Sequence, residues 1–174
     1  KAAHMAGVML KCHYCPTAAR AALVRECVSH IAVFGSIVLN RAVGGLNPDA
    51  VDSFIRLTHE RYYAILAEHF GHTVTAFFTD EPSPMGRYPR EGARPYTWGF
   101  SQWLTGQGFD VDKLPLLWFD GDGAYEVRRQ YGRLVNRRLC ESFYRPLFDW
   151  CGRHGVALAG HPAESDDVAA YRWM

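Results

Sequence analysis

The spacing of apolar residues predicts a long helix followed by a short buried strand in the middle of the chain. Apolar side chains recur at helical intervals through residues 47–69. Asn47 suits the cap of this helix, and Pro48 suits its first turn. Gly71 is a typical residue just past a helix end. The apolar run 73–79 follows directly and predicts a strand.

The same order of elements recurs near the end of the sequence. Apolar residues share one helical stripe through residues 125–154, and Gly155 ends it. Pro146 is expected to kink or split this helix, because its ring clashes with the carbonyl group four residues earlier. The apolar run 156–160 then predicts a second strand. Both strands are apolar on both faces, which is typical of a parallel sheet covered by helices. The pattern therefore predicts an α/β fold.

The remaining segments give weaker signals. Residues 16–27 are rich in alanine, leucine and arginine, which favours a helix. Residues 30–40 have the alternation of a strand or hairpin arm, with Gly35 as a candidate bulge. Residues 83–96 are rich in proline and glycine and predict a long loop. A short helix is expected in residues 97–106.

Polar side chains follow each of the two predicted strands. Asp80 and Glu81 come directly after the first strand, and His161 and Glu164 come after the second. Functional sites of parallel α/β folds lie at the carboxyl ends of the strands. We therefore expect these four residues at one rim of the sheet. Two adjacent acids can also simply be solvated.

Composition limits the possible partners. The 174 residues suffice for one folded domain, and 48% of them are hydrophobic. The net charge of +1 gives no support for a nucleic-acid or membrane partner. The five cysteines do not indicate a disulfide scaffold, which favours a reducing compartment such as the cytoplasm. Residues 1–10 lack the core of a signal peptide, and we expect the rest of a longer polypeptide to be missing.

Two segments carry a resemblance to a known family. The run LNPDAVDSFIRLTHERYYAILAEHFGHTVTAFFTDEPSPMGR and the later run YRPLFDWCGRHGVALAGHPAE resemble the catalytic barrel of bacterial glycoside hydrolases related to the α-L-rhamnosidases, over residues 46–165. The resemblance implies that residues 46–174 are part of a (β/α)8 TIM barrel with parallel strands and no cofactor. Residues 1–45 would be a short β-rich segment, the end of an insertion that precedes the barrel.

The resemblance also implies roles for the residues after the strands. Glycosidic cleavage needs a protonated carboxylic acid beside the leaving oxygen and a second carboxylate across the sugar. Glu81 is the expected general acid. Glu164 is a candidate for the second carboxylate by its position only, because the family usually takes this carboxylate from a later strand. Asp80 alternates away from Glu81 along a regular strand and is expected to bind sugar hydroxyls or to orient another group. His161 is expected to bind sugar hydroxyls, and the alternative is a structural histidine. The expected substrate is a carbohydrate, a rhamnoside or a related plant or bacterial glycan.

Two residues in or after the long loop complete the predicted carbohydrate site. Arg87 could contact sugar hydroxyls, and Trp98 could form a flat stacking platform. The alternative is a loop packed by its own aromatic side chains.

A metal site near the N-terminus is a rival interpretation. Cys12, Cys15, Cys27 and His30 form the spacing C-x2-C-x11-C-x2-H, which can bind zinc tetrahedrally. The alternative is a set of small buried cysteines beside a helix. The rival function to a glycosidase is a non-catalytic module that binds carbohydrate or is stabilised by zinc.

Overall fold

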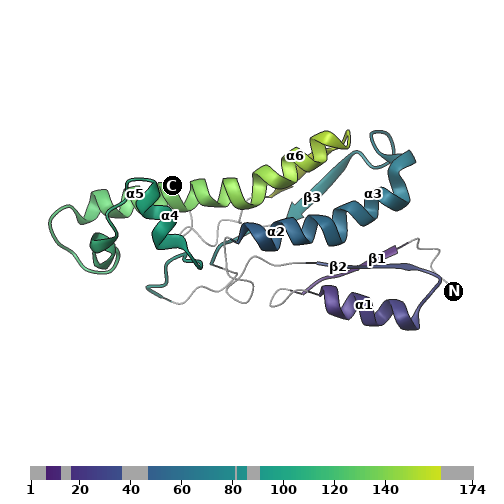
Figure 1. Ribbon diagram of the computed structural model, residues 1–174, viewed down its shortest axis with the longest axis horizontal. Helices are drawn as coiled ribbons and strands as arrows, with labels where there is room; N and C mark the ends of the chain where they lie inside the picture. The colour runs from purple at the N-terminus through teal and green to yellow at the C-terminus, as the bar shows by residue number, and fades with distance from the viewer. Residues whose placement is uncertain (1–6, 13–16, 37–46, 81, 86–90, 162–174) are drawn as a thin grey trace.

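A computed structural model describes residues 7–12, 17–36, 47–80, 82–85 and 91–161. The chain alternates between strands and helices (Figure 1). The first half contains β1 (Gly7–Leu10), α1 (Ala18–Cys27), β2 (Ala32–Gly35), α2 (Pro48–Phe54), the π-helical turn η2 (Ile55–His59), α3 (Glu60–Leu66) and the 3-10 turn η3 (Ala67–His69). The second half contains β3 (Ala76–Asp80), α4 (Phe100–Gly106), the 3-10 helix η4 (Val111–Leu117), α5 (Ala124–Leu139), the π-helical turn η5 (Cys140–Tyr144), α6 (Arg145–Arg153) and β4 (Ala157–His161).

The described strands form two separate parallel pairs. Strand β1 pairs with β2, and β3 pairs with β4 in the register from Ala76↔Ala157 to Asp80↔His161. The predicted α/β fold with parallel strands is confirmed. No backbone strand pairing joins the two pairs within the described residues, so these strands do not close a barrel.

The helix predicted for residues 47–69 is present and begins where the sequence indicates. The Asn47 side chain accepts hydrogen bonds from the backbone N–H groups of Asp49 at 3.1 Å and Ala50 at 3.4 Å. Pro48 occupies the first turn, where a missing N–H has no cost. The helix continues from α2 through η2 and α3 to η3. The wide turn η2 was not predicted from the sequence.

The second long helix accommodates Pro146 without breaking. Helix α5 continues through η5 into α6, and Pro146 lies in the first turn of α6. The Arg145 N–H bonds to the carbonyl of Cys140, five residues earlier. This wider turn makes room for the proline ring, which a regular α-helix would press against a carbonyl. Figure 1 shows the helix changing direction in this region.

Helix packing covers one face of the β3–β4 pair. Trp150, Cys151 and Val156 form a buried cluster, and Phe77 and Leu158 from the strands pack against it. Phe78 points to the other face by strand alternation, and 61% of its surface is exposed. Among the described residues, this second face is therefore open at the position of Phe78.

The β1–β2 pair contacts helices on both faces. On one face α1 lies so close to Gly35 that a Cβ there would be 2.6 Å from the Cα of Ala18. On the other face, Phe34 stacks on Tyr62 of α3 with ring centroids 4.0 Å apart. Figure 1 accordingly shows the α2–α3 helix between the β1–β2 pair and β3. The bulge predicted at Gly35 is wrong, because Gly35 pairs in regular register with Leu10.

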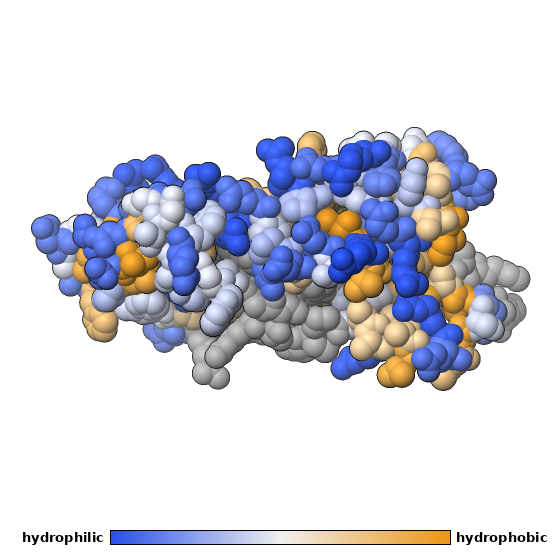
Figure 2. Space-filling model, in the orientation of Figure 1, coloured by the Kyte–Doolittle hydropathy of each residue, from blue (hydrophilic) through white to orange (hydrophobic). Residues whose placement is uncertain are grey.

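The outer face of α1 is partly apolar. Leu23 is 63% exposed, and Figure 2 shows apolar side chains at the surface over this helix. No helix in the described ranges has both the length and the apolar character needed to cross a membrane.

Candidate active site at the carboxyl ends of the strands

Three side chains from three different strands meet at one rim of the molecule. The Nζ atom of Lys11, the residue after β1, lies 2.9 Å from Oδ2 of Asp80 at the end of β3. Nδ1 of His161, at the end of β4, lies 3.9 Å from Oδ1 of the same carboxylate. The carboxylate of Asp80 therefore stands between a lysine and a histidine, and we call these three residues the rim cluster.

The strand register explains how Asp80 and His161 come together. They are direct neighbours in the parallel β3–β4 pair, so their side chains lie on the same face of the sheet. By alternation this is the face of Phe78, opposite the helices. The Phe78 ring meets the His161 ring edge to face, with centroids 5.1 Å apart. The rim cluster thus has an apolar wall beside its charged groups.

The rim cluster is accessible from solvent. The side chains of Lys11 and His161 are each 56% exposed, and that of Asp80 is 46% exposed. An ion pair this exposed contributes at most about 1 kcal/mol to stability. The Lys11–Asp80 ion pair therefore adds little to the stability of the fold. Its two opposite charges lie where a ligand from solvent can reach them.

A buried histidine lies behind β3, on the helix-covered face. His59 is 5% exposed and stacks on Phe77 with ring centroids 4.7 Å apart. Its ring also meets those of Phe54 and Trp150 edge to face. Its Nδ1 atom has no hydrogen-bond partner among the described residues. Burial lowers the pKa of His59 to about 4, against a raising effect of Glu60 and a smaller lowering effect of His154.

We expect His59 to make the stability of the protein depend on pH. Its folded pKa of about 4 lies below the unfolded value of 6.5, so the unfolded chain binds the proton more readily. The contribution of His59 is complete above pH 6.5 and is lost as the pH falls toward 4. Urea unfolding should show a loss of about 2 kcal/mol between pH 7 and pH 5.

The control for this effect is a variant with a ring that cannot be protonated. In His59→Phe the difference between pH 7 and pH 5 should shrink by about 2 kcal/mol. An unchanged difference would show that His59 titrates normally in the folded protein.

The other predicted site residues are not part of the rim cluster as described. Glu81, Arg87 and Glu164 lie outside the described residues, so their roles stay predictions. Trp98 is 97% exposed, and among the described residues it makes no ring contact with the rim cluster. The substrate-binding roles of Asp80 and His161 also stay predictions, but the structure brings these two side chains together.

Lys11 was missed by the sequence analysis. The signal was present, because Lys11 is a polar residue directly after an apolar run, the same pattern that pointed to Asp80 and His161. The run Gly7–Leu10 has only four residues, too few to establish a strand by alternation.

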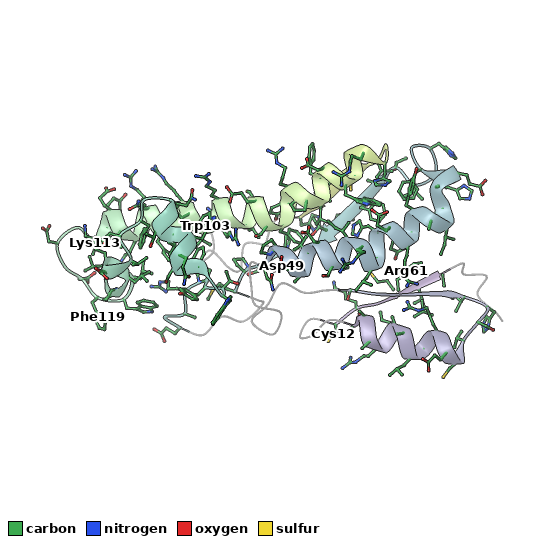
Figure 3. The ribbon with its side chains drawn as sticks, in the orientation of Figure 1. Cys12, Asp49, Arg61, Trp103, Lys113 and Phe119 are labelled. Atoms are coloured by element: carbon green, nitrogen blue, oxygen red, sulfur yellow. The ribbon has the colours of Figure 1, made fainter. Side chains whose placement is uncertain are left out.

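The described residues give the predicted zinc site no support. Cys15 lies outside them. Cys12 lies near the start of α1, as Figure 3 shows, whereas Cys27 is the last residue of this 10-residue helix. A helix of that length spans about 15 Å, far more than one tetrahedral zinc can bridge. Within the described ranges, no three His, Cys, Asp or Glu side chains converge as metal ligands.

Comparison with known proteins gives a match to a family model. The model of a family of unknown function, DUF6282, matches residues 1–66. No curated protein and no solved structure matches the chain. The matched residues include β1, α1, β2, most of the following helix and Lys11 of the rim cluster. Asp80 and His161 lie beyond the match.

Proposed function

We propose that the chain is part of a hydrolase whose active site is the rim cluster. The observation that carries this proposal is the approach of Lys11, Asp80 and His161 from the ends of β1, β3 and β4. Parallel α/β enzymes place their catalytic groups at such strand ends. A carboxylate, an imidazole and an ammonium group within one cluster can bind a polar substrate and transfer protons to or from it.

We further propose that the bond cleaved is glycosidic. This step is supported by the resemblance of residues 46–165 to the barrel of glycoside hydrolases related to the α-L-rhamnosidases. In this account Glu81, the residue after Asp80, protonates the leaving oxygen. Asp80, Lys11 and His161 hold sugar hydroxyls, and the exposed Phe78 ring contacts the apolar face of the sugar.

The corresponding proposal for the fold is a portion of a (β/α)8 barrel. Its support is the order of helices and strands from α2 to β4 and the parallel pairing of β3 with β4. In a barrel, the open face of β3 and β4 would be turned to the interior. The exposed Phe78 then belongs to a surface that further strands would cover.

Hydrolysis of 4-nitrophenyl glycosides tests the proposed function. We expect the wild-type chain to release nitrophenol from an α-L-rhamnoside or a related glycoside. Glu81→Gln should lower kcat/KM by at least about a hundredfold, the smallest effect typical of lost acid–base catalysis. Asp80→Asn removes a charged hydrogen-bond acceptor for the sugar and should lower kcat/KM about tenfold to a hundredfold. Circular dichroism should show that both variants keep the wild-type fold.

A matched control is available at the other end of the molecule. Asp110 pairs with Lys113 at 3.5 Å and is 54% exposed, so like Asp80 it is an exposed aspartate in an ion pair with a lysine. Asp110 is not at a strand end, because it directly precedes η4. Asp110→Asn should keep the wild-type rate. Equal rates in Asp80→Asn, Glu81→Gln and the wild type would contradict the proposed active site.

A non-catalytic carbohydrate-binding module is the second candidate. The observation in its favour is the 97% exposure of Trp98, an indole available for stacking on a sugar ring. This function predicts glycan binding that is lost in Trp98→Ala and kept in Asp80→Asn, with no hydrolysis by the wild type.

A further inference from the structure

A buried hydroxyl network lies directly behind Lys11, at the carboxyl ends of β1 and β2. Thr17, which is 1% exposed, donates from Oγ1 to the backbone carbonyl of Leu10 at 2.5 Å. Ser36 donates from Oγ to the same carbonyl at 2.9 Å. Leu10 is the last residue of β1, and Lys11 follows it. Two hydroxyl groups therefore hold the peptide group from which Lys11 extends.

The two hydroxyl-bearing residues are also bound to each other. The Ser36 N–H donates to Thr17 Oγ1 at 2.7 Å, and the Thr17 N–H donates to the Ser36 carbonyl at 2.9 Å. This reciprocal pair joins the residue after β2 to the start of α1. The close approach of α1 to Gly35 leaves no space for a side chain there. The end of β1 is thus fixed to the two neighbouring elements.

The hydroxyl of Thr17 does not serve the helix that it precedes. Threonine before a helix commonly accepts a hydrogen bond from an N–H of the first turn, which stabilises the helix by about 1 kcal/mol. Thr17 is the N-cap of α1 but makes no such bond. Its hydroxyl is directed instead to Leu10. The Thr17 hydroxyl therefore does not cap α1, and it fixes the end of β1 beside the rim cluster instead.

We propose that Thr17 and Ser36 are positioning residues that hold Lys11 against Asp80. The inference rests on the proposed function, because positioning Lys11 matters for function only if the rim cluster acts on a substrate. Neither hydroxyl contacts Asp80 or His161 among the described residues. They act through the Leu10 carbonyl, which sets the direction in which the chain leaves β1.

Lysine acetylation measured residue by residue tests this proposal without any substrate. The lysines of the sequence are Lys1, Lys11 and Lys113. Lys113 is an internal reference, because it is 57% exposed against 56% for Lys11 and is also paired with an aspartate. Lys113 lies in η4, and Figure 3 shows it away from the strands. The measured quantity is the ratio of the acetylation rates of Lys11 and Lys113 in the folded protein.

An amine held in an ion pair must leave its partner before it can attack the reagent, so the pair slows acetylation. In Thr17→Val, which keeps the shape but removes the hydroxyl, the Lys11:Lys113 ratio should rise twofold to fivefold, about the strength of an exposed ion pair. Asp80→Asn should give the same rise. Thr17→Ser should restore the wild-type ratio, because serine supplies the hydroxyl. Ser36→Ala should give a smaller rise.

The outcomes separate this proposal from its alternatives. A general loss of stability would raise the acetylation of both lysines and leave their ratio unchanged. An unchanged ratio in Thr17→Val, with a rise in Asp80→Asn, would overturn the positioning role. If Thr17→Val does not fold, an unchanged ratio in Ser36→Ala would overturn it. If no glycoside is hydrolysed but the ratio rises as expected, the proposed function fails and the positioning of Lys11 stands.

Discussion

Replacing Trp150 by alanine is expected to destabilise the protein by about 3–5 kcal/mol, the usual cost of removing a large buried aromatic side chain. Trp150 is 1% exposed. Its ring contacts those of His59, Phe77 and His154, so it joins both long helices to β3. Its Nε1 atom donates to the Glu60 carboxylate at 2.7 Å. The substitution would leave a cavity and remove this hydrogen bond between the two long helices.

Trp98 provides a control of the same residue type. It is 97% exposed, so Trp98→Ala should change stability by less than about 0.5 kcal/mol. Urea unfolding followed by circular dichroism measures both variants. Similar midpoints for Trp150→Ala and the wild type would show that the two long helices do not pack on β3 as described.

Gly160→Ala is expected to disrupt the strand pair that carries the rim cluster. A Cβ at Gly160 would lie 2.1 Å from the carbonyl oxygen of Thr79, its partner in the β3–β4 register. Backbone atoms must move to relieve such a contact. We expect a loss of about 3 kcal/mol, at the upper end of the range for overpacking. Asp80 and His161 form the pair next to Thr79 and Gly160 in the β3–β4 register, so hydrolytic activity should fall as well.

Gly152→Ala is the matched control for this substitution. Gly152 lies in α6, and apart from the backbone of its own helix and its chain neighbours no described atom lies within 4 Å of the position of an added Cβ. Alanine is favoured over glycine in a helix by up to about 1 kcal/mol, so this variant should be as stable as the wild type or more so. Thermal unfolding compares the two. Equal melting temperatures for Gly160→Ala and the wild type would contradict the described register.

Local signals in the sequence were sufficient to predict the long helices. Asn47 and Pro48 mark the start of the first, and Pro146 marks the irregular turn in the second. The predicted kink is confirmed by the change of direction in Figure 1, and the wider turn η5 accompanies it. The wide turn η2 has no comparable marker, since Ile55–His59 contains neither proline nor glycine.

Long-range contacts could not be predicted in the same way. Asp80 and His161 stood out because each follows a recognisable apolar run. The strand pairing that makes them neighbours joins residues far apart in the sequence. To predict Lys11 as a site residue, one would have to recognise the short strand β1 and know that Lys11 lies close to Asp80. The network of Thr17 and Ser36 depends on the close packing of α1 against Gly35, which no local pattern specifies.

The most direct test of the proposed active site is whether residues from three strands act as one catalytic unit. We would measure kcat/KM with the best 4-nitrophenyl glycoside for the wild type, Lys11→Met, His161→Asn and the double variant. Groups that act together give strongly non-additive losses. We predict that each single variant loses about tenfold to a hundredfold, the usual effect of removing a charged hydrogen-bond partner, and that the double variant loses little more than the worse single one. Wild-type rates in both single variants would contradict the account.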